Sequence, residues 1–133
     1  MKVVFADSAY FMALLNARDQ YHERAKQASA GLEGQILTTI WALTEVADAF
    51  CKPGQRDIAA AFLKDLQTDA RVIVIPPAMD VFNRGLAFYS QRPDKDWSLT
   101  DCISFVVMEE RGITDALATD RDFKQAGFVP LLQ

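Results

Sequence analysis

Acidic side chains at the ends of short apolar runs are the residues of this sequence best placed to do chemistry. Asp7 directly follows the run Val3–Ala6, and Asp120 directly follows the run Ala116–Thr119. Short apolar runs of this kind predict buried strands. Because the carboxyl ends of parallel strands meet at one edge of a sheet, we expect both carboxylates at the same edge.

Two further acids complete a group of candidate site residues. Asp101 lies in the first turn of a helix predicted over Leu99–Arg111, which is apolar nearly all round. A carboxylate on such a helix is costly unless it is paired or binds a cation. Glu45 lies in a predicted helix over residues 39–51 and shares a face with Trp41, four residues earlier. We therefore expect four carboxylates to converge, namely Asp7, Glu45, Asp101 and Asp120.

Grouped carboxylates of this kind are typical of a site for a hard divalent cation. They repel one another, and some of them take up protons at neutral pH unless positive charge balances them. The chain has one histidine and two cysteines, so oxygen ligands dominate and Mg²⁺ or Mn²⁺ is favoured over zinc. An ion held in this way activates water and neutralises charge on a phosphate, which is the chemistry of phosphodiester cleavage.

Each acid also has a purely structural interpretation. Asp7 and Asp120 can cap the helices that follow them, and Ser98 with Asp101 fits a capping box. Glu45 can be an ordinary solvated glutamate on the face opposite the apolar stripe of its helix. Under this interpretation the protein is a non-catalytic binding module.

Length and composition place the chain among ordinary globular proteins. Its 133 residues, half of them apolar, predict a single domain spanning residues 1–133. No apolar run approaches the length that crosses a bilayer or forms a secretory signal, so we expect a cytoplasmic protein without a membrane partner. The net charge of −4 argues against a general nucleic-acid coating protein, and the segment from Asp94 to Asp122 alone carries eight acids against three bases.

Strands and helices alternate along the whole chain, which predicts an α/β fold. Besides the elements above, helices are expected up to Leu15 and over residues 21–32, 56–66, 79–89 and 120–125, and strands over residues 35–38, 71–75 and 129–132. This alternation implies a mainly parallel central sheet with helices on both faces.

Four segments carry a resemblance to a known family. They are Val4-Phe5-Ala6-Asp7-Ser8, Thr44-Glu45-Val46, the segment Ser98 to Phe105 that contains Asp101, and Ala118-Thr119-Asp120-Arg121-Asp122-Phe123. In their order and spacing they resemble the acidic motifs of PIN domains, and most closely those of VapC-type toxins from bacterial and archaeal toxin–antitoxin pairs. The resemblance extends from Val3 to about Phe128. It implies a three-layer α/β/α sandwich with a central, mainly parallel sheet.

The resemblance also implies an activity and its partners. PIN toxins are Mg²⁺- or Mn²⁺-dependent endoribonucleases, a class of hydrolase, that leave a 5′-phosphate and a 3′-hydroxyl. By this likeness the catalytic and metal-binding residues are Asp7, Glu45, Asp101 and Asp120, with Asp122 as an auxiliary metal ligand. The family further implies a homodimer, an RNA substrate and inhibition by a cognate antitoxin protein.

Other functions stay open at this point. A PIN nuclease can serve housekeeping RNA processing instead of a toxin role. A phosphatase with Asp7 as nucleophile is a second alternative, but related haloacid dehalogenases carry another Asp two residues later, where this chain has Ala9.

Several other side chains have both a functional and a structural interpretation. Ser8 and Thr119 flank the acids and can orient a ligand or cap a helix. His22 is expected to be exposed, and Cys51 and Cys102 to be buried. Five basic residues can contact RNA phosphates, although scattered surface charge is the simpler explanation for most of them. They are Arg84, Arg92, Lys95, Arg121 and Lys124. Apolar residues that can line an antitoxin groove, or simply fill the core, are Tyr10, Phe11, Leu14 and Phe62.

Overall fold

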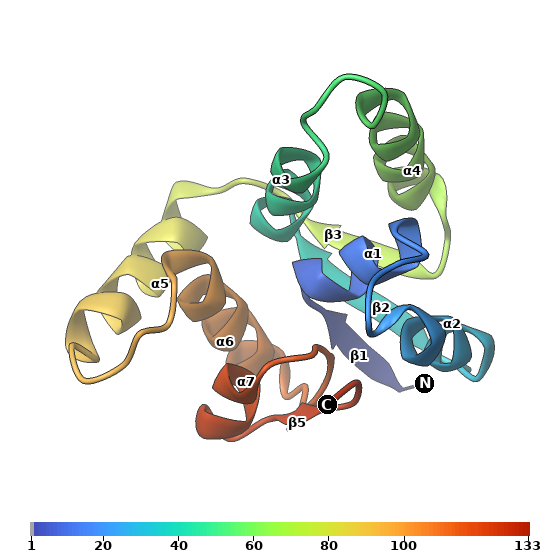
Figure 1. Cartoon of the computed structure of the whole chain (residues 1–133). Coiled ribbons are helices and arrows are strands. Elements are labelled where there is room, and N and C mark those ends of the chain that lie inside the picture. The colour runs from blue at the N-terminus through green and yellow to red at the C-terminus, as the bar shows by residue number, and fades with distance from the viewer. Residues whose placement is uncertain (1) are drawn as a thin grey trace.

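A sheet of five parallel strands forms the centre of the protein (Figure 1). The structure, a computed structural model, describes residues 2–133. The strands are β1 (Val3–Ala6), β2 (Gln35–Thr39), β3 (Val72–Ile75), β4 (Asp115–Leu117) and β5 (Val129–Pro130). Their order across the sheet is β3-β2-β1-β4-β5, and every neighbouring pair is parallel. The predicted α/β fold with a parallel central sheet is confirmed.

Helices connect the strands and cover both faces of the sheet. They are α1 (Ser8–Leu15), α2 (His22–Ala30), α3 (Ile40–Ala49), α4 (Arg56–Thr68), α5 (Met79–Gln91), α6 (Leu99–Arg111) and α7 (Arg121–Gln125). Val4 and Ala6 of β1 pack in a core cluster with side chains of α1 to α4, whereas Phe5 packs with α6 and α7. Successive side chains of a strand point to opposite faces, so one strand contributes to both cores. The result is the expected three-layer sandwich.

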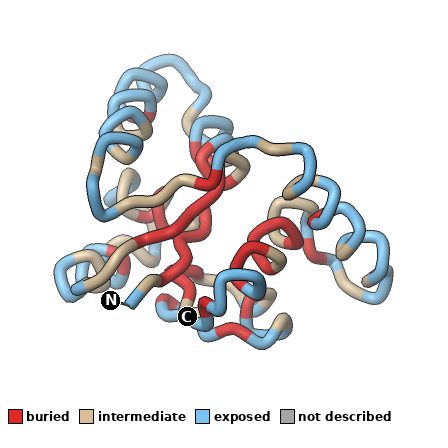
Figure 2. Tube along the Cα trace, turned by 180° about the vertical axis from the view of Figure 1, so that it is seen from behind, coloured by how far each residue is buried: buried red, intermediate tan, exposed pale blue. Residues whose placement is uncertain are grey.

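The buried residues follow the central strands and α6 (Figure 2). Within the α6 layer, the ring of Phe105 contacts three other aromatic rings, with centroid distances of 5.0 Å to Phe123, 5.1 Å to Trp97 and 5.7 Å to Phe128. Aromatic pairs in this range add about 0.5–1.5 kcal/mol each beyond the burial of their area. This cluster fixes α6 against α7 and therefore fixes the acids at the start of both helices.

The last two strands are shorter than the sequence predicts. β4 ends at Leu117 instead of Thr119, because β1, its partner, ends at Ala6 and pairs there with Leu117. The last bond of this ladder runs from the backbone N–H of Asp7 to the carbonyl of Leu117, at 3.1 Å. Asp120 consequently follows the strand after two further residues and not directly. β5 likewise ends at Pro130, two residues before the predicted end.

Two single-residue expectations are wrong. His22 is half-buried, and its Nδ1 donates a hydrogen bond to the carbonyl of Ala13 at 2.6 Å. Cys51 is exposed, while Cys102 is buried as expected. Tyr10 and Phe11 are buried, and Leu14 and Phe62 pack against their cluster, which confirms the core interpretation for all four. Within residues 2–133 no helix combines the length and the apolar character that spanning a bilayer requires.

Candidate active site

Asp7 stands at the carboxyl end of the central strand β1 and is buried, with 5% of its surface exposed. Its backbone is extended and occupies the N-cap position of α1, but its side chain makes no capping hydrogen bond to that helix. The structural interpretation of Asp7 as a helix cap therefore does not account for its carboxylate. A buried carboxylate without a capping role is a candidate for chemistry.

Asp101 caps the start of α6 and also contributes a carboxylate to the group of acids. Its backbone N–H donates to Ser98 Oγ at 3.0 Å, and its Oδ2 accepts from the backbone N–H of Ser98 at 3.2 Å, which confirms the capping box. These two bonds fix the rotamer of the side chain at the start of α6. The capping box therefore orients the carboxylate and does not remove its charge from the site.

Asp120 and Asp122 form a pair at the start of α7. Asp120 is the N-cap of this helix, and its Oδ1 accepts from the backbone N–H of Asp122 at 3.1 Å. Both residues are half-buried. The capping interpretation of Asp120 is confirmed, and one of its carboxylate oxygens makes that capping bond.

Glu45 is linked to the site through Ser8. The Ser8 hydroxyl donates to Glu45 Oε1 at 2.9 Å, so the first residue of α1 holds a side chain of α3. Ser8 is buried and Glu45 is half-buried, which contradicts the interpretation of Glu45 as a freely solvated side chain. The sequence placed Ser8 beside the acids but did not reveal this bond, because nothing in the spacing shows which helix lies opposite α1.

The start of α3 is fixed by the two threonines that end β2. Thr38 Oγ1 donates to the carbonyl of Ala6 at 2.8 Å, and Thr39 Oγ1 accepts from the backbone N–H of Ala42 at 3.1 Å. Both threonines are fully buried. One therefore ties the end of β2 to the end of β1, and the other caps the helix that carries Glu45.

The electrostatics show that the acids are close enough to interact. Burial raises the pKa of Asp7 from 3.8 to about 8, and repulsion by the carboxylates of Asp101, Asp120 and Glu45 adds to the effect, against the opposing backbone hydrogen bond of Ser8. Burial also raises the pKa of Asp101 to about 6, despite the hydrogen bonds from Ser98. The structure thus brings the predicted carboxylates of β1, α3, α6 and the β4–α7 connection to one edge of the sheet.

Asp122 belongs to the outer part of the same group. Its pKa is raised by burial and by the carboxylates of Asp120 and Asp96, while Arg121 lowers it. It also raises the pKa of Asp101. Asp122 therefore contributes negative charge to the site from its α7 side.

The group fits a divalent cation in charge and in donor type. All of its donors are carboxylate oxygens, and burial together with repulsion from the neighbouring carboxylates raises the pKa of Asp7 to about 8, an effect that a bound cation would oppose. Among residues 2–133, however, no three Asp, Glu, His or Cys side chains are placed so that they could jointly hold one metal ion. Direct ligation of one ion by three of these acids therefore requires side-chain rotation.

The basic residues predicted to meet phosphates occupy different surroundings. Arg84 donates through Nε and Nη2 to Glu110, at 2.6 and 3.0 Å, and is thus paired on the outer side of α5 and α6. Arg92 makes a two-point contact with Asp94 in the loop before α6. Arg121 and Lys124 lie on α7, which begins directly after Asp120. These two are the closest in sequence to the acids.

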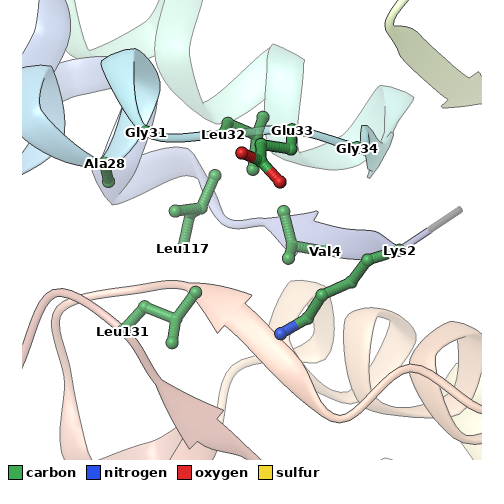
Figure 3. A pocket seen from close by; sticks show the side chains of 9 residues that line it. All are labelled: Lys2, Val4, Ala28, Gly31, Leu32, Glu33, Gly34, Leu117 and Leu131. Carbon is green, nitrogen blue, oxygen red and sulfur yellow. The ribbon is translucent and has the colours of Figure 1, made fainter.

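Two hollows differ in their relation to this site. One of about 560 Å³ lies between the segment that joins α2 to β2, the start of β1, and the residues Leu117 and Leu131 (Figure 3). None of the candidate acids lines it. A smaller hollow of about 280 Å³ adjoins the carboxyl edge and includes Thr119, the neighbour of Asp120. The site therefore lies at the edge with the smaller hollow, as the rule for parallel sheets requires.

Comparisons with known proteins agree with this fold. The profile of the PIN domain family matches residues 4–129. The 23S rRNA-specific endonuclease VapC20 of Mycobacterium tuberculosis is 31% identical over 128 residues, which cover 96% of each chain. The crystal structure of that protein, described as a sarcin–ricin loop cleaving toxin, has a TM-score of 0.87 at 28% identity and covers 95% of this chain and 96% of the other.

A more distant structure shares the fold. The crystal structure of FitAcB from Neisseria gonorrhoeae has a TM-score of 0.63 at 10% identity and covers 96% of this chain and 94% of the other. At that identity the likeness shows the fold alone. The profile match, the VapC20 identity and the carboxylates at the edge of a parallel sheet lead to one conclusion: this chain belongs to the PIN domain family.

Proposed function

We propose that this protein is an endoribonuclease that hydrolyses RNA phosphodiester bonds with Mg²⁺ or Mn²⁺ and acts as the toxin of a toxin–antitoxin pair. The observation that carries the proposal is the group of carboxylates around Asp7, whose pKa is raised by burial and further by repulsion from Asp101, Asp120 and Glu45. A binding module whose acids only cap helices does not need this arrangement, because Asp7 makes no side-chain cap.

The residues that would hold the ion are Asp7, Glu45, Asp101 and Asp120, with Asp122 as an auxiliary ligand. When bound, such an ion supplies positive charge for the developing phosphorane and lowers the pKa of an attacking water. The protein keeps the acids in position through the capping box of Ser98, the Ser8–Glu45 bond and the burial of Asp7. We expect in-line hydrolysis that leaves a 5′-phosphate and a 3′-hydroxyl.

The substrate and partners follow from the relatives. VapC20 is named as a 23S rRNA-specific endonuclease and as a sarcin–ricin loop cleaving toxin. We propose ribosomal RNA as the first substrate to test, in the cytoplasm where it is found. We also propose a homodimer and an antitoxin protein that inhibits it.

A cleavage assay tests the proposal directly. Purified protein is incubated with an end-labelled RNA hairpin carrying the sarcin–ricin loop sequence, in Mg²⁺, in Mn²⁺ and in excess chelator. We expect cleavage with either ion and none with chelator, and we expect Asp7→Asn to abolish it while circular dichroism stays unchanged. Equal cleavage with ion and with chelator would refute the metal mechanism, and full activity of Asp7→Asn would refute the role of Asp7.

The toxin role is separated from housekeeping RNA processing by brief induction in cells. A toxin arrests growth within one generation, and mapping of total RNA then shows one new major cleavage site. We expect co-expression of the cognate antitoxin to relieve the arrest. Normal growth during induction, with trimmed precursors in place of new internal ends, would support RNA processing instead.

A further inference from the structure

The hollow beside the acids is built from three separate segments. It has a volume of about 280 Å³, and its lining residues are Ala9, Met12, Asp19, Gln20, Tyr21 and Thr119. Ala9 follows Asp7 by two residues, and Thr119 immediately precedes Asp120. The hollow therefore shares the start of α1 and the β4–α7 connection with the carboxylate group, and the loop that leads into α2 completes it.

Local bonds fix the shape of this hollow in the free protein. Asp19 Oδ1 accepts from the backbone N–H of Tyr21 at 2.8 Å, which holds the loop in a turn. The guanidinium of Arg24 lies 5.7 Å from the centre of the Tyr21 ring and donates to the carbonyl of Leu132 at 3.1 Å. Arg24 thus connects the Tyr21 ring to the end of the chain. A site that exists before binding costs little ordering entropy when a ligand enters.

The chemistry of the lining suits a flat, neutral ring. Ala9, Met12 and the Tyr21 ring offer apolar and aromatic surface, while Gln20 and Thr119 offer groups that both donate and accept hydrogen bonds. No lysine or arginine lines the hollow, so it does not suit a phosphate. Its volume lies just below the usual range of ligand pockets, about 300–1,000 Å³, so it has room for one small ring system.

We propose that this hollow receives one nucleobase of the RNA substrate, the base on one side of the bond that is cut. The proposal rests on the proposed ribonuclease function and adds to it a position where the sequence of the RNA is recognised. Unpaired RNA bases stack on aromatic side chains and are recognised at their edges. An RNA strand whose phosphate lies at the acids has the adjoining base close to this hollow, because Ala9 and Thr119 line the hollow and lie within two residues of Asp7 and Asp120 in the chain.

The lining also favours some bases over others. Asp19 carries a carboxylate, which only accepts hydrogen bonds. Adenine, cytosine and guanine present an amino group with two donor hydrogens to it, whereas uracil presents only the single N–H of N3, with a carbonyl oxygen on each side that the carboxylate repels. We therefore expect a base with an amino group at this position of the RNA and discrimination against uracil.

Abasic substitution in the RNA tests the subsite. The probe is the sarcin–ricin hairpin with a single abasic nucleotide placed in turn at each position around the cleaved bond, and kcat/KM is measured for each. We expect one abasic position adjacent to the bond to lower kcat/KM by about 5- to 150-fold, the usual effect of one stacked base. With the Tyr21→Leu variant, kcat/KM for the intact hairpin should fall by a similar factor. The abasic nucleotide at the same position should then lower kcat/KM of this variant only slightly further.

A matched control separates the subsite from general damage. Tyr89→Leu removes an exposed tyrosine from α5, away from the hollow. In this variant the abasic nucleotide should lower kcat/KM as much as it does in the wild type, an effect that we call the abasic penalty. Should Tyr21→Leu fold poorly, Gln20→Ala at an exposed loop position serves in its place and should reduce the same penalty. Asp19→Asn keeps an oxygen for the Tyr21 N–H and should relax the discrimination against uracil.

The outcomes distinguish this proposal from the proposed function. Cleavage with no abasic penalty next to the cut bond, or with an equal penalty in wild type and Tyr21→Leu, overturns the subsite and leaves the nuclease intact. If the wild type leaves both the hairpin and total cellular RNA uncut in Mg²⁺ and Mn²⁺, the proposed function fails and the subsite fails with it. A wild-type preference for uracil at the sensitive position overturns the assignment of Asp19.

Discussion

At the scale of single residues, the burial of Asp7 links the stability of the protein to pH. Its pKa is about 8 in the folded protein against 3.8 for the free side chain, so the folded state holds a proton between these values that the unfolded state has lost. Stability therefore falls as the pH rises from about 4 to about 8. One pKa unit corresponds to about 1.4 kcal/mol, which makes the loss measurable.

We expect the free energy of unfolding of the metal-free protein to fall by at least about 1 kcal/mol between pH 5 and pH 8. A pKa shift of a single unit already corresponds to this amount. The Asp7→Asn variant has no titrating group at position 7, so its stability should depend less on pH. It should be more stable than the wild type at pH 8. Urea denaturation in chelator at both pH values measures the effect. Parallel profiles for the two proteins would show that Asp7 ionises normally.

Ser8 is the residue that connects Glu45 to the site. Ser8→Ala removes the donor of the 2.9 Å bond and leaves the Glu45 carboxylate free to rotate. We expect stability to fall by about 1 kcal/mol, the usual net value of one hydrogen bond, and kcat to fall about tenfold with little change in KM. Ser8→Thr retains a hydroxyl and should recover most of kcat.

A control isolates this positioning role. Ser90→Ala removes a hydroxyl from an exposed position on α5, where it donates only to the carbonyl of Ala87. It should leave kcat unchanged. If Ser8→Ala lost stability to the expected extent but retained full kcat, Glu45 would not depend on Ser8 for its catalytic position.

At the scale of elements, the packing of α5 on α6 sets where Asp101 stands. Gly85 is buried in α5, and a Cβ at this position would lie 2.3 Å from Cγ1 of Ile103, two residues after Asp101 in α6. The two helices therefore approach each other more closely than any larger residue permits. This contact determines the distance between α5 and α6.

We expect Gly85→Ala to destabilise the protein by about 1–3 kcal/mol, because overpacking must push the helices apart. Gly31→Ala is the matched control, since its added Cβ would meet only the carbonyl of Gln27 at 3.5 Å. Thermal unfolding of both variants provides the measurement. An unchanged melting temperature in Gly85→Ala would mean that Ile103 yields without moving α6.

At the scale of the whole molecule, the sequence was sufficient to predict the three layers and the edge of the sheet at which the acids lie. Alternating strands and helices lead to a parallel sheet, and acids after β1 and before α7 then meet by topology alone. What the sequence could not supply was contact between helices far apart in the chain. The Ser8–Glu45 bond and the hydrogen bond of His22 to Ala13 depend on how α1 packs, which no local pattern encodes.

The acids come from both layers of the sandwich, and this has a consequence for the stability of the entire chain. Glu45 belongs to α3 on one face of the sheet, while Asp101 belongs to α6 on the other. An ion that binds both layers is lost when either layer unfolds. Its binding free energy is then added to the stability of the complete fold.

We therefore expect Mn²⁺ or Mg²⁺ to raise the melting temperature at pH 7.5. A tenfold excess over the dissociation constant adds about 1.4 kcal/mol, which corresponds to roughly 4 °C for a chain of this size. Asp7→Asn and Asp101→Asn should each abolish the increase, whereas Glu109→Gln, an exposed acid at the other end of α6, should keep it. An equal increase in all three variants would mean that the ion stabilises the protein through its general negative charge, and the carboxylates at the edge of the sheet would then not form a metal site.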